Sequence, residues 1–279
     1  MSGHTGDKQY MTAISDAELK KVSFDILLFV DEFCKQKGIC YFLCGGTMLG
    51  AFRHKGFIPW DDDIDIMMPR AHYDRFLCEF PAHDCYALDA PGLTPGYPFA
   101  YAKVVDKRTV KYQGAVRERF KDGYVDVDVF PIDNVPDSEE EQKRFFDSIK
   151  RIEDRRTFFL FPKREKGLKP LAARMVRAVL EWTGLMNIDK AVAAFCRLAR
   201  KYESSGSGLW AITSIHHYGI KEVNTAADYF PVLEAEFEGR SFPVPSNYDT
   251  YLTRLYGDYM KMPPADRQKT HHLFDAYWR

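Results

Sequence analysis

The chain has 279 residues, of which 46% are hydrophobic, 15% aromatic and 28% charged, so it has enough apolar residues to form the core of a globular protein. Its 39 basic and 40 acidic residues give a formal net charge of -1, which argues against a basic protein for duplex nucleic acid and against an acidic disordered chain. No apolar run is long enough to span a membrane, and the polar start argues against a secretory signal. The 6 cysteines contain no C-x-x-C pair, so we expect reduced thiols in a cytoplasmic protein.

Helix and strand patterns alternate in the first half of the chain. A polar start that we expect to be frayed runs to residue 14, and a capping-box signature from Ser15 to Glu18 then opens a helix that Gly38 ends. The patterns that follow predict a strand over 40–44, a turn over 45–47, a helix over 48–54 closed by Gly56, a strand over 63–68, a helix over 70–80, a loop over 91–98, and strands over 99–105, 109–112 and 124–130.

The second half is mainly helical by its pattern. Helical spacing extends over 139–203 with breaks near Pro162, Gly167, Pro170 and Gly184, and it is followed by short strands over 234–239 and 241–245 and by a helix from residue 248. This order predicts an α+β fold, with a mixed-sheet core over 15–136 and a mainly helical region over 137–279 whose short strands complete the site.

Acidic residues are concentrated in the segment WDDDIDI, residues 60–66. Four carboxylates within five residues repel one another unless a cation or water compensates them. Residues two apart on a strand share a face, so we expect Asp63 and Asp65 to project together. Paired carboxylates suit Mg²⁺ or Mn²⁺. The pattern returns in Asp126-Val127-Asp128, and Asp128 completes a three-carboxylate metal site if the two strands are neighbours.

Other readings of the acidic segment differ in how well they fit. A calcium loop requires glycine where Ile66 stands and glutamate where His72 stands, so that reading fails. Neither a G-K-[ST] phosphate loop nor a G-x-S-x-G elbow occurs. A solvated acidic strand face remains the alternative to a metal site.

A glycine pair precedes the acidic segment. Gly45-Gly46-Thr47 ends a predicted strand and opens a helix, where backbone N–H groups and the helix dipole favour a phosphate. The turn alone is a weak signal for phosphate binding, but its position shortly before the acidic strand strengthens that interpretation.

Residues 45–76, GGTMLGAFRHKGFIPWDDDIDIMMPRAHYDRF, resemble the signature of the LicD family of phosphotransferases. That family is similar to the fukutin-type enzymes and belongs to the nucleotidyltransferase fold of the polymerase-β kind. Weaker likenesses lie at 101–109, 124–136 and 237–264. The resemblance implies donor-phosphate contacts from Gly45, Gly46 and Thr47, metal ligation and catalysis by Asp63, Asp65 and Asp128, and lesser candidates in Asp62 and Asp126.

Several basic and aromatic residues are further candidates for donor binding. Arg53 and Lys55 suit phosphate, although basic residues also favour helix ends. Lys103 is expected to be a phosphate ligand, and Trp60 either stacks on a base or belongs to the core. The resemblance adds Arg267 and His271, which are expected to close over the site.

The resemblance implies a divalent-metal-dependent enzyme that moves phosphocholine, or a related phospho-alcohol, from a CDP-linked donor to a hydroxyl of a cell-surface glycan such as lipopolysaccharide or teichoic acid. Two alternatives stay open. One is a nucleotidyltransferase that places a nucleotide from an NTP on a small alcohol or antibiotic, and the other is a non-catalytic nucleotide-binding protein. The phosphocholine transferase would release CMP from its donor, whereas the nucleotidyltransferase would release pyrophosphate from an NTP.

Basic residues are concentrated in the segment 143–177, which holds twelve lysines and arginines against four acidic residues. A basic amphipathic segment favours peripheral contact with an anionic membrane, here the inner face of the cell membrane, and a solvated helical face is the alternative.

Overall fold

The computed structural model describes residues 11–113, 122–160, 175–176, 179–180, 183, 187–215, 217–270 and 274–279. Its centre is a mixed sheet with the strand order β1-β11-β5-β6-β3-β2, in which β4 pairs with β5, β7 with β6, and β8 with β7. These strands are β1 (Thr12–Ala13), β2 (Phe42–Leu43), β3 (Asp65–Pro69), β4 (Tyr86–Asp89), β5 (Ala102–Gln113), β6 (Asp122–Asn134), β7 (Leu209–Ile212), β8 (Asn224–Thr225) and β11 (Phe274–Trp278).

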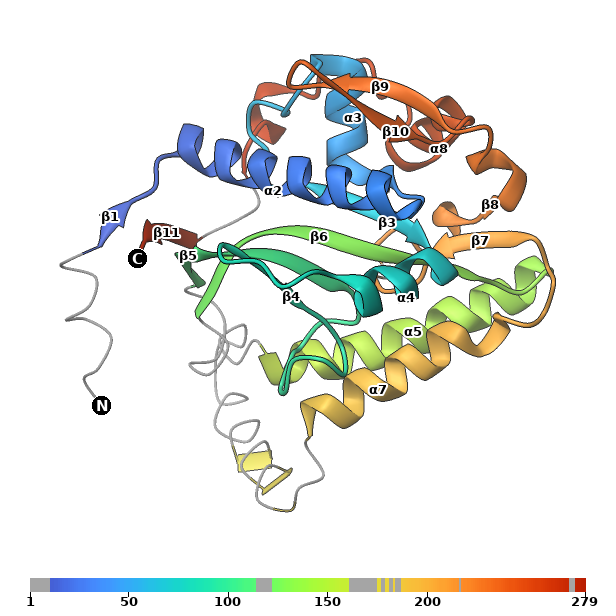
Figure 1. The fold of residues 1–279 in the computed structure, drawn as a ribbon. Helices are drawn as coiled ribbons and strands as arrows, with labels where there is room; N and C mark the ends of the chain where they lie inside the picture. The colour runs from blue at the N-terminus through green and yellow to red at the C-terminus, as the bar shows by residue number, and fades with distance from the viewer. Residues whose placement is uncertain are drawn as a thin grey trace.

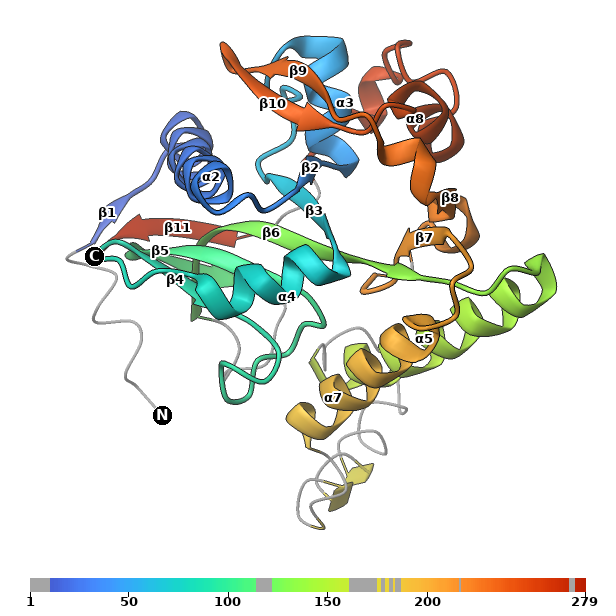
Figure 2. The ribbon, with the colours of Figure 1, turned by 45° about the vertical axis from the view of Figure 1, so that its right-hand side comes forward.

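Helices surround the sheet, and a separate hairpin of β9 (Leu233–Phe237) and β10 (Arg240–Val244) lies beside α3 and α8 (Figures 1 and 2). The helix α2 runs along one side of the sheet, while α5 and α7 pack together on the other side of β6 (Figure 1). The α-helices are α2 (Asp16–Lys37), α3 (Gly45–His54), α4 (Arg70–Glu79), α5 (Glu139–Leu160), α7 (Ile188–Ala199) and α8 (Tyr248–Tyr256). The short 3₁₀ helices are η3 (Arg200–Tyr202), η4 (Gly219–Glu222), η5 (Ala226–Tyr229) and η6 (Ala265–Arg267). The predicted α+β fold is confirmed.

The helix α2 forms as its sequence predicts. The Ser15 hydroxyl accepts the Glu18 N–H at 3.3 Å, and the Ser15 N–H donates to the Glu18 carboxylate at 2.9 Å, which completes the capping box. Gly38 ends the helix with φ 61°, a conformation that glycine adopts without a Cβ clash. The apolar stripe of α2 is fully buried against the sheet at Ile26, Leu27 and Val30.

Two boundaries near the glycine pair differ from the sequence prediction. Gly45-Gly46-Thr47 is the first turn of α3 rather than a separate turn, because β2 has only two residues and Cys44 already caps the helix. The helix ends at His54 as predicted, but its C-cap is Lys55, with φ 61°, rather than Gly56. The early reversal at Lys55 lets the backbone of Gly56 lie against Gly50.

Strand boundaries differ as well. The predicted strand over 63–68 begins only at Asp65, so Asp63 belongs to the preceding loop. The strands predicted over 99–105 and 109–112 are one strand, β5, which begins at Ala102 rather than at residue 99. Its register shifts between Asp106 and Lys111.

The sequence prediction missed several short strands. Residues 12–13, expected to be frayed, form β1 and pair with β11, and neither β11 nor β4 was predicted. A strand of two to five residues has too little alternation to be recognised without its partner. The strands β7 and β11 join the sheet from beyond residue 136, and the division into 15–136 and 137–279 stays a prediction.

The basic segment begins on α5, whose first residues form i,i+4 ion pairs on the helix surface. Lys143 lies 2.8 Å from Glu139, and Lys150 lies 2.8 Å from Asp154. Residues 161–174 and 177 lie outside the described part of the chain, so the predicted membrane contact remains a prediction. Among the described residues, no helix is long and apolar enough to cross a membrane.

Gly50→Ala is expected to destabilise the protein by about 1–3 kcal/mol through overpacking. A Cβ at Gly50 would lie 2.4 Å from the backbone oxygen of Gly56, and neither backbone can yield without moving the end of α3. Gly123→Ala is the matched control, since its Cβ would meet only the Lys111 backbone oxygen at 3.9 Å. Urea unfolding of both variants tests this, and equal midpoints would contradict it.

Candidate functional site

The two acidic strands predicted from the sequence lie side by side. The strand β3 pairs in parallel with β6, and this register places Asp65 directly opposite Asp128. The Asp128 N–H donates to the Ile64 carbonyl at 2.9 Å, and the Asp65 N–H donates to the Thr47 hydroxyl at 2.8 Å. The first turn of α3 therefore fixes the strand end that carries Asp65. Thr47 is buried and provides the hydroxyl that accepts this hydrogen bond.

The loop before β3 brings three more carboxylates to the same region. One oxygen from each of Asp61, Asp62 and Asp63 lies within 4.8 Å of the other two. Among the described residues, this trio alone meets that spacing, so the structure does not bring Asp63, Asp65 and Asp128 together as closely.

The glycine pair gives the carboxylates room at the start of α3. A Cβ at Gly46 would lie 2.6 Å from Asp61 Oδ2, and one at Gly45 would lie 3.1 Å from Asp65 Oδ2. Gly45 also has φ 52°, which disfavours other residues. The sequence therefore needs glycine at both positions to place carboxylates against a helix N-terminus.

These carboxylates open into a cleft of about 760 Å³. Its lining comes from α3, the β3 and β6 strands, the segment after β7, and α8 with the residues that follow it. Of the predicted site residues, it includes Gly45, Gly46, Arg53, Trp60, Asp63, Asp65 and Asp128.

Lys103 lies within the acidic cluster. Its ammonium donates to Asp126 and, at 2.5 Å, to Asp128, and it lies over the ring of Phe99 at 5.1 Å. Lys111 holds the other oxygen of Asp126 at 2.5 Å. The carboxylate of Asp126 thus accepts hydrogen bonds from both lysines. Asp128 accepts one from Lys103 and lies opposite Asp65.

The pKa values follow from this arrangement. Burial, and then the charges of Asp63 and Asp128, raise the pKa of Asp65 well above its usual value. Burial raises the pKa of Asp128 to about 6, although Lys103 opposes the shift. Burial would also raise the pKa of Asp126, but Lys103 and Lys111 lower it below its usual value.

The donor set fits a hard divalent cation. Asp63, Asp65 and Asp128 line one cleft and offer only carboxylate oxygens, which Mg²⁺ and Mn²⁺ prefer. Burial, together with the charges of Asp63 and Asp128, disfavours the ionised form of Asp65 and raises its pKa. A cation bound here would compensate that negative charge.

The predicted basic residues fall into two groups. Arg53 lines the cleft and donates to the Tyr259 carbonyl at 2.9 Å, which links α3 to the segment after α8. Lys55 and Arg267 are exposed and do not line the cleft, and His271 lies outside the described residues. Trp60 is partly buried, packs against the core and lines the cleft, and its stacking on a base stays a prediction.

Several residues of the cleft were not predicted from the sequence. They are Cys44, Asp61, His217, Tyr218, Glu222, Tyr251, Tyr256, Asp258, Tyr259 and Lys261. The tyrosines of α8 and its extension stand in YDTYLTRLYGDYM, and their recurrence was the available signal. Glu222 has no other acidic residue or motif around it, so the sequence gave no signal for it.

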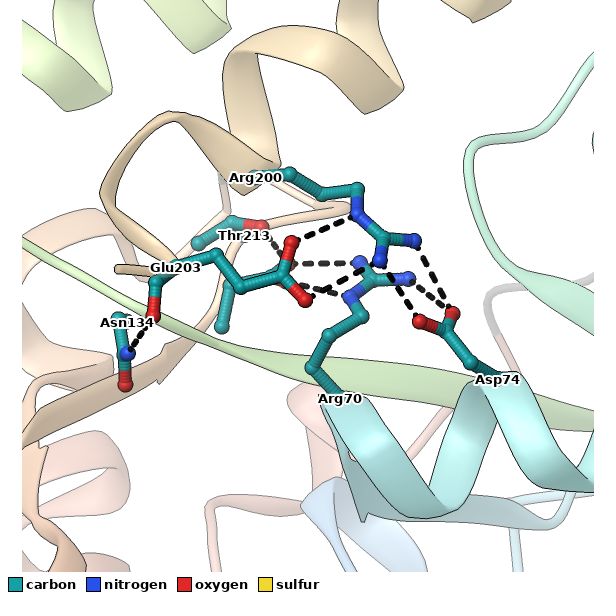
Figure 3. Close-up of polar contacts among 7 residues, drawn as sticks. Arg70, Asp74, Asn134, Arg200, Glu203 and Thr213 are labelled. Carbon is teal, nitrogen blue, oxygen red and sulfur yellow. Dashed lines mark hydrogen bonds and ion pairs between the residues drawn. The ribbon is translucent and has the colours of Figure 1, made fainter. Parts of the chain in front are cut away.

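The far ends of β3 and β6 are joined by a second charged network (Figure 3). Arg70, at the start of α4, contacts both carboxylate oxygens of Asp133 at 2.6 and 2.9 Å, and Thr213 donates to the same carboxylate at 2.6 Å. Arg200 joins Asp74 to the end of α7. This network fixes α4, which directly follows β3, to the C-terminal part of β6. Asp65 begins β3, and Asp128 lies in the middle of β6.

The chain is similar to one protein family and to several individual proteins. Residues 38–176 match the family described as LicD/FKTN/FKRP, nucleotidyltransferase domain. The chain is 32% identical over 274 residues to the lipopolysaccharide cholinephosphotransferase LicD of Haemophilus influenzae, covering 96% of this chain and 99% of the relative. An uncharacterized protein of Rickettsia prowazekii is 37% identical over 105 residues, 33% of this chain and 36% of that protein. An uncharacterized protein of Rickettsia typhi is 32% identical over 84 residues, which are 26% of this chain and 27% of that protein.

Proposed function

Because the chain belongs to the LicD/FKTN/FKRP family, we propose that it transfers phosphocholine from CDP-choline to a hydroxyl of a cell-surface glycan. The observation that carries the proposal is the pairing of Asp65 with Asp128 in a cleft that the N-terminus of α3 also lines. The relative that matches 96% of the chain is named for cholinephosphate transfer to lipopolysaccharide, which favours phosphocholine and a lipopolysaccharide acceptor over other phospho-alcohols and teichoic acid.

The donor diphosphate is proposed to lie at the start of α3. The backbone N–H groups of Gly45 and Gly46 belong to the first helical turn, which leaves them without partners inside the helix. Asp63, Asp65 and Asp128 are the proposed ligands of Mg²⁺ or Mn²⁺, which when bound would neutralise the diphosphate and the charge of the leaving CMP.

The chemical step is a substitution at phosphorus. The acceptor oxygen attacks the phosphorus atom that carries choline, a new P–O bond forms, and the P–O bond to CMP breaks. The hydroxyl proton passes to a carboxylate, Asp128 or Asp65, while Arg53 at the edge of the cleft favours binding of the anionic nucleotide.

The acceptor suggests where the enzyme works. A glycan built on a lipid is held at a membrane, and a basic segment such as 143–177 favours an anionic lipid surface. We therefore keep peripheral contact with the inner face of the cell membrane as part of the proposal.

The activity is tested by incubating the full chain with Mn²⁺, lipopolysaccharide lacking phosphocholine, and CDP-choline, CDP-ethanolamine, CDP-glycerol or CDP-ribitol in turn. We expect CMP release with CDP-choline that depends on both metal and acceptor, measured by chromatography. Parallel reactions with NTPs test the nucleotidyltransferase alternative, which pyrophosphate release without CMP from CDP-choline would support. Binding of CDP-choline with no product from any donor would instead support a non-catalytic protein, although the joint presence of Asp63, Asp65 and Asp128 argues against it.

A further inference from the structure

One part of the cleft, next to Gly45, is lined by tyrosine rings and a buried glutamate. Tyr218 and Tyr256 line the cleft, with ring centroids 5.7 Å apart and ring planes at 80°. A Cβ at Gly45 would lie 3.9 Å from the Tyr256 hydroxyl oxygen and 3.1 Å from Asp65 Oδ2. Tyr256 therefore adjoins both the acidic cluster and the backbone proposed to bind the donor phosphates, and Tyr218 lies beside Tyr256.

Glu222, at the end of η4, lines the same cleft and is only 2% exposed. Its carboxylate accepts the Tyr251 hydroxyl at 3.1 Å. Arg254, whose charge reaches Glu222, instead donates to the Val223 carbonyl and, at 3.0 Å, to Asn224 Oδ1. Among the residues that the structure describes, no lysine or arginine forms an ion pair with Glu222.

This environment disfavours the ionised form of the Glu222 carboxylate. Burial raises the pKa of Glu222 to about 7, and the hydrogen bond from Tyr251 and the charge of Arg254 oppose this only in part. A buried carboxylate without a paired cation is destabilising, and such a group persists where something else requires it. A cation brought by the ligand would supply the missing partner.

We propose that Glu222, Tyr218 and Tyr256 form the subsite that binds the trimethylammonium group of the choline donor. The inference rests on the phosphocholine transfer proposed above and names the residues that select the alcohol. In phosphocholine the ammonium lies two carbon atoms from the ester oxygen, which matches a subsite adjoining the phosphate-binding backbone at Gly45.

The chemistry of the subsite favours a quaternary ammonium over other cations. Such a group carries full charge but no N–H donor, so aromatic rings and one carboxylate suffice to bind it. A divalent metal requires about six oxygen ligands, which one carboxylate and tyrosine hydroxyls do not provide. A primary ammonium would need an acceptor for each of its three donors.

Glu222→Gln is the first test, since glutamine keeps the volume and an oxygen that accepts from Tyr251. We expect kcat/KM for CDP-choline to fall about tenfold or more, as for loss of a desolvated charge partner, while kcat/KM for neutral CDP-glycerol changes by less than about twofold. Glu236→Gln, at an exposed position of β9, is the matched control and should leave both values unchanged. An equal fall for both donors would overturn the proposal, because Glu222 would then serve a step common to all donors.

Binding of choline itself tests the subsite without turnover. Saturation-transfer NMR should detect choline but not 3,3-dimethylbutan-1-ol, which has the same shape and no charge, and Glu222→Gln should weaken the choline signal. Tyr218→Leu should weaken it as well, and Tyr218→Phe should retain it, because the ring rather than the hydroxyl binds the cation. Equal signals for the two probes would overturn the subsite. Glu222-dependent choline binding by a protein that turns over no CDP-alcohol would leave the subsite standing and reject the proposed reaction.

Discussion

Asp65→Asn is expected to lower kcat for CMP release about 1000-fold, the scale of losing a preorganised charge at a reaction centre. The substitution keeps the shape of the side chain and the backbone N–H that donates to Thr47, so the fold is retained. The free energy of unfolding without metal should stay the same or rise, because asparagine removes a buried charge that Asp63 and Asp128 repel.

A metal titration separates the catalytic role from a structural one. Mn²⁺ should raise the melting temperature of the native protein, and this rise should disappear in Asp65→Asn and in Asp128→Asn. Asp84→Asn, at an exposed position, is the control and should keep both activity and the metal-dependent rise. An Asp65→Asn variant with more than a tenth of native turnover, or with the full metal-dependent rise, would contradict the assignment.

The acidic centre was largely predictable from the sequence because its signal is local. Carboxylates alternating with apolar residues at Asp63, Asp65 and Asp128 predicted two buried strands that share a function, and the parallel register of β3 with β6 pairs Asp65 with Asp128. The predicted LicD family and the class of transferase are confirmed by the match at 38–176 and by the relative that spans 96% of the chain.

The rest of the cleft was not predictable because it depends on pairing between distant segments. Glu222 and the tyrosines of α8 reach the acidic cluster only after β7 has joined β6 and α8 has packed beside α3. Lys103 was predicted to bind phosphate, yet the structure places it on Asp126 and Asp128, since β5 pairs Lys103 with Asp128. Cross-strand partners of this kind are set by register, which one strand's sequence does not reveal.

The start of β3 also depends on strand pairing that the sequence does not reveal. The alternation from Asp63 to Asp65 is continuous in the sequence, but pairing with β6 begins at Asp65. Asp63 therefore shares its loop with Asp61 and Asp62 instead of sharing a strand face with Asp65. Loop carboxylates can move toward a cation more readily than strand residues, so we expect this loop to adjust when metal binds.

Arg70→Met is expected to destabilise the protein by about 3–5 kcal/mol, the cost of leaving a buried charge without its partner. The carboxylate of Asp133 is 2% exposed, and among the described residues it would keep only the hydrogen bond from the Thr213 hydroxyl once Arg70 is lost. Methionine retains most of the side-chain volume, so the loss would report the charge rather than a cavity. For a chain of this length, the melting temperature should fall by on the order of 10 °C.

Arg200→Met is the matched control, because Arg200 also forms a two-point contact, with Asp74, but is 40% exposed. Water solvates Asp74 when that partner is lost, so we expect a change of less than about 1 kcal/mol. Denaturant unfolding of the two variants measures the difference directly, and equal losses would show that burial of Asp133 does not set the strength of this network. If the larger loss is found for Arg70→Met, the Arg70–Asp133 ion pair anchors the chain directly after β3 to the C-terminal part of β6. This anchor explains how β3 keeps Asp65 facing Asp128 although only five residues form the strand.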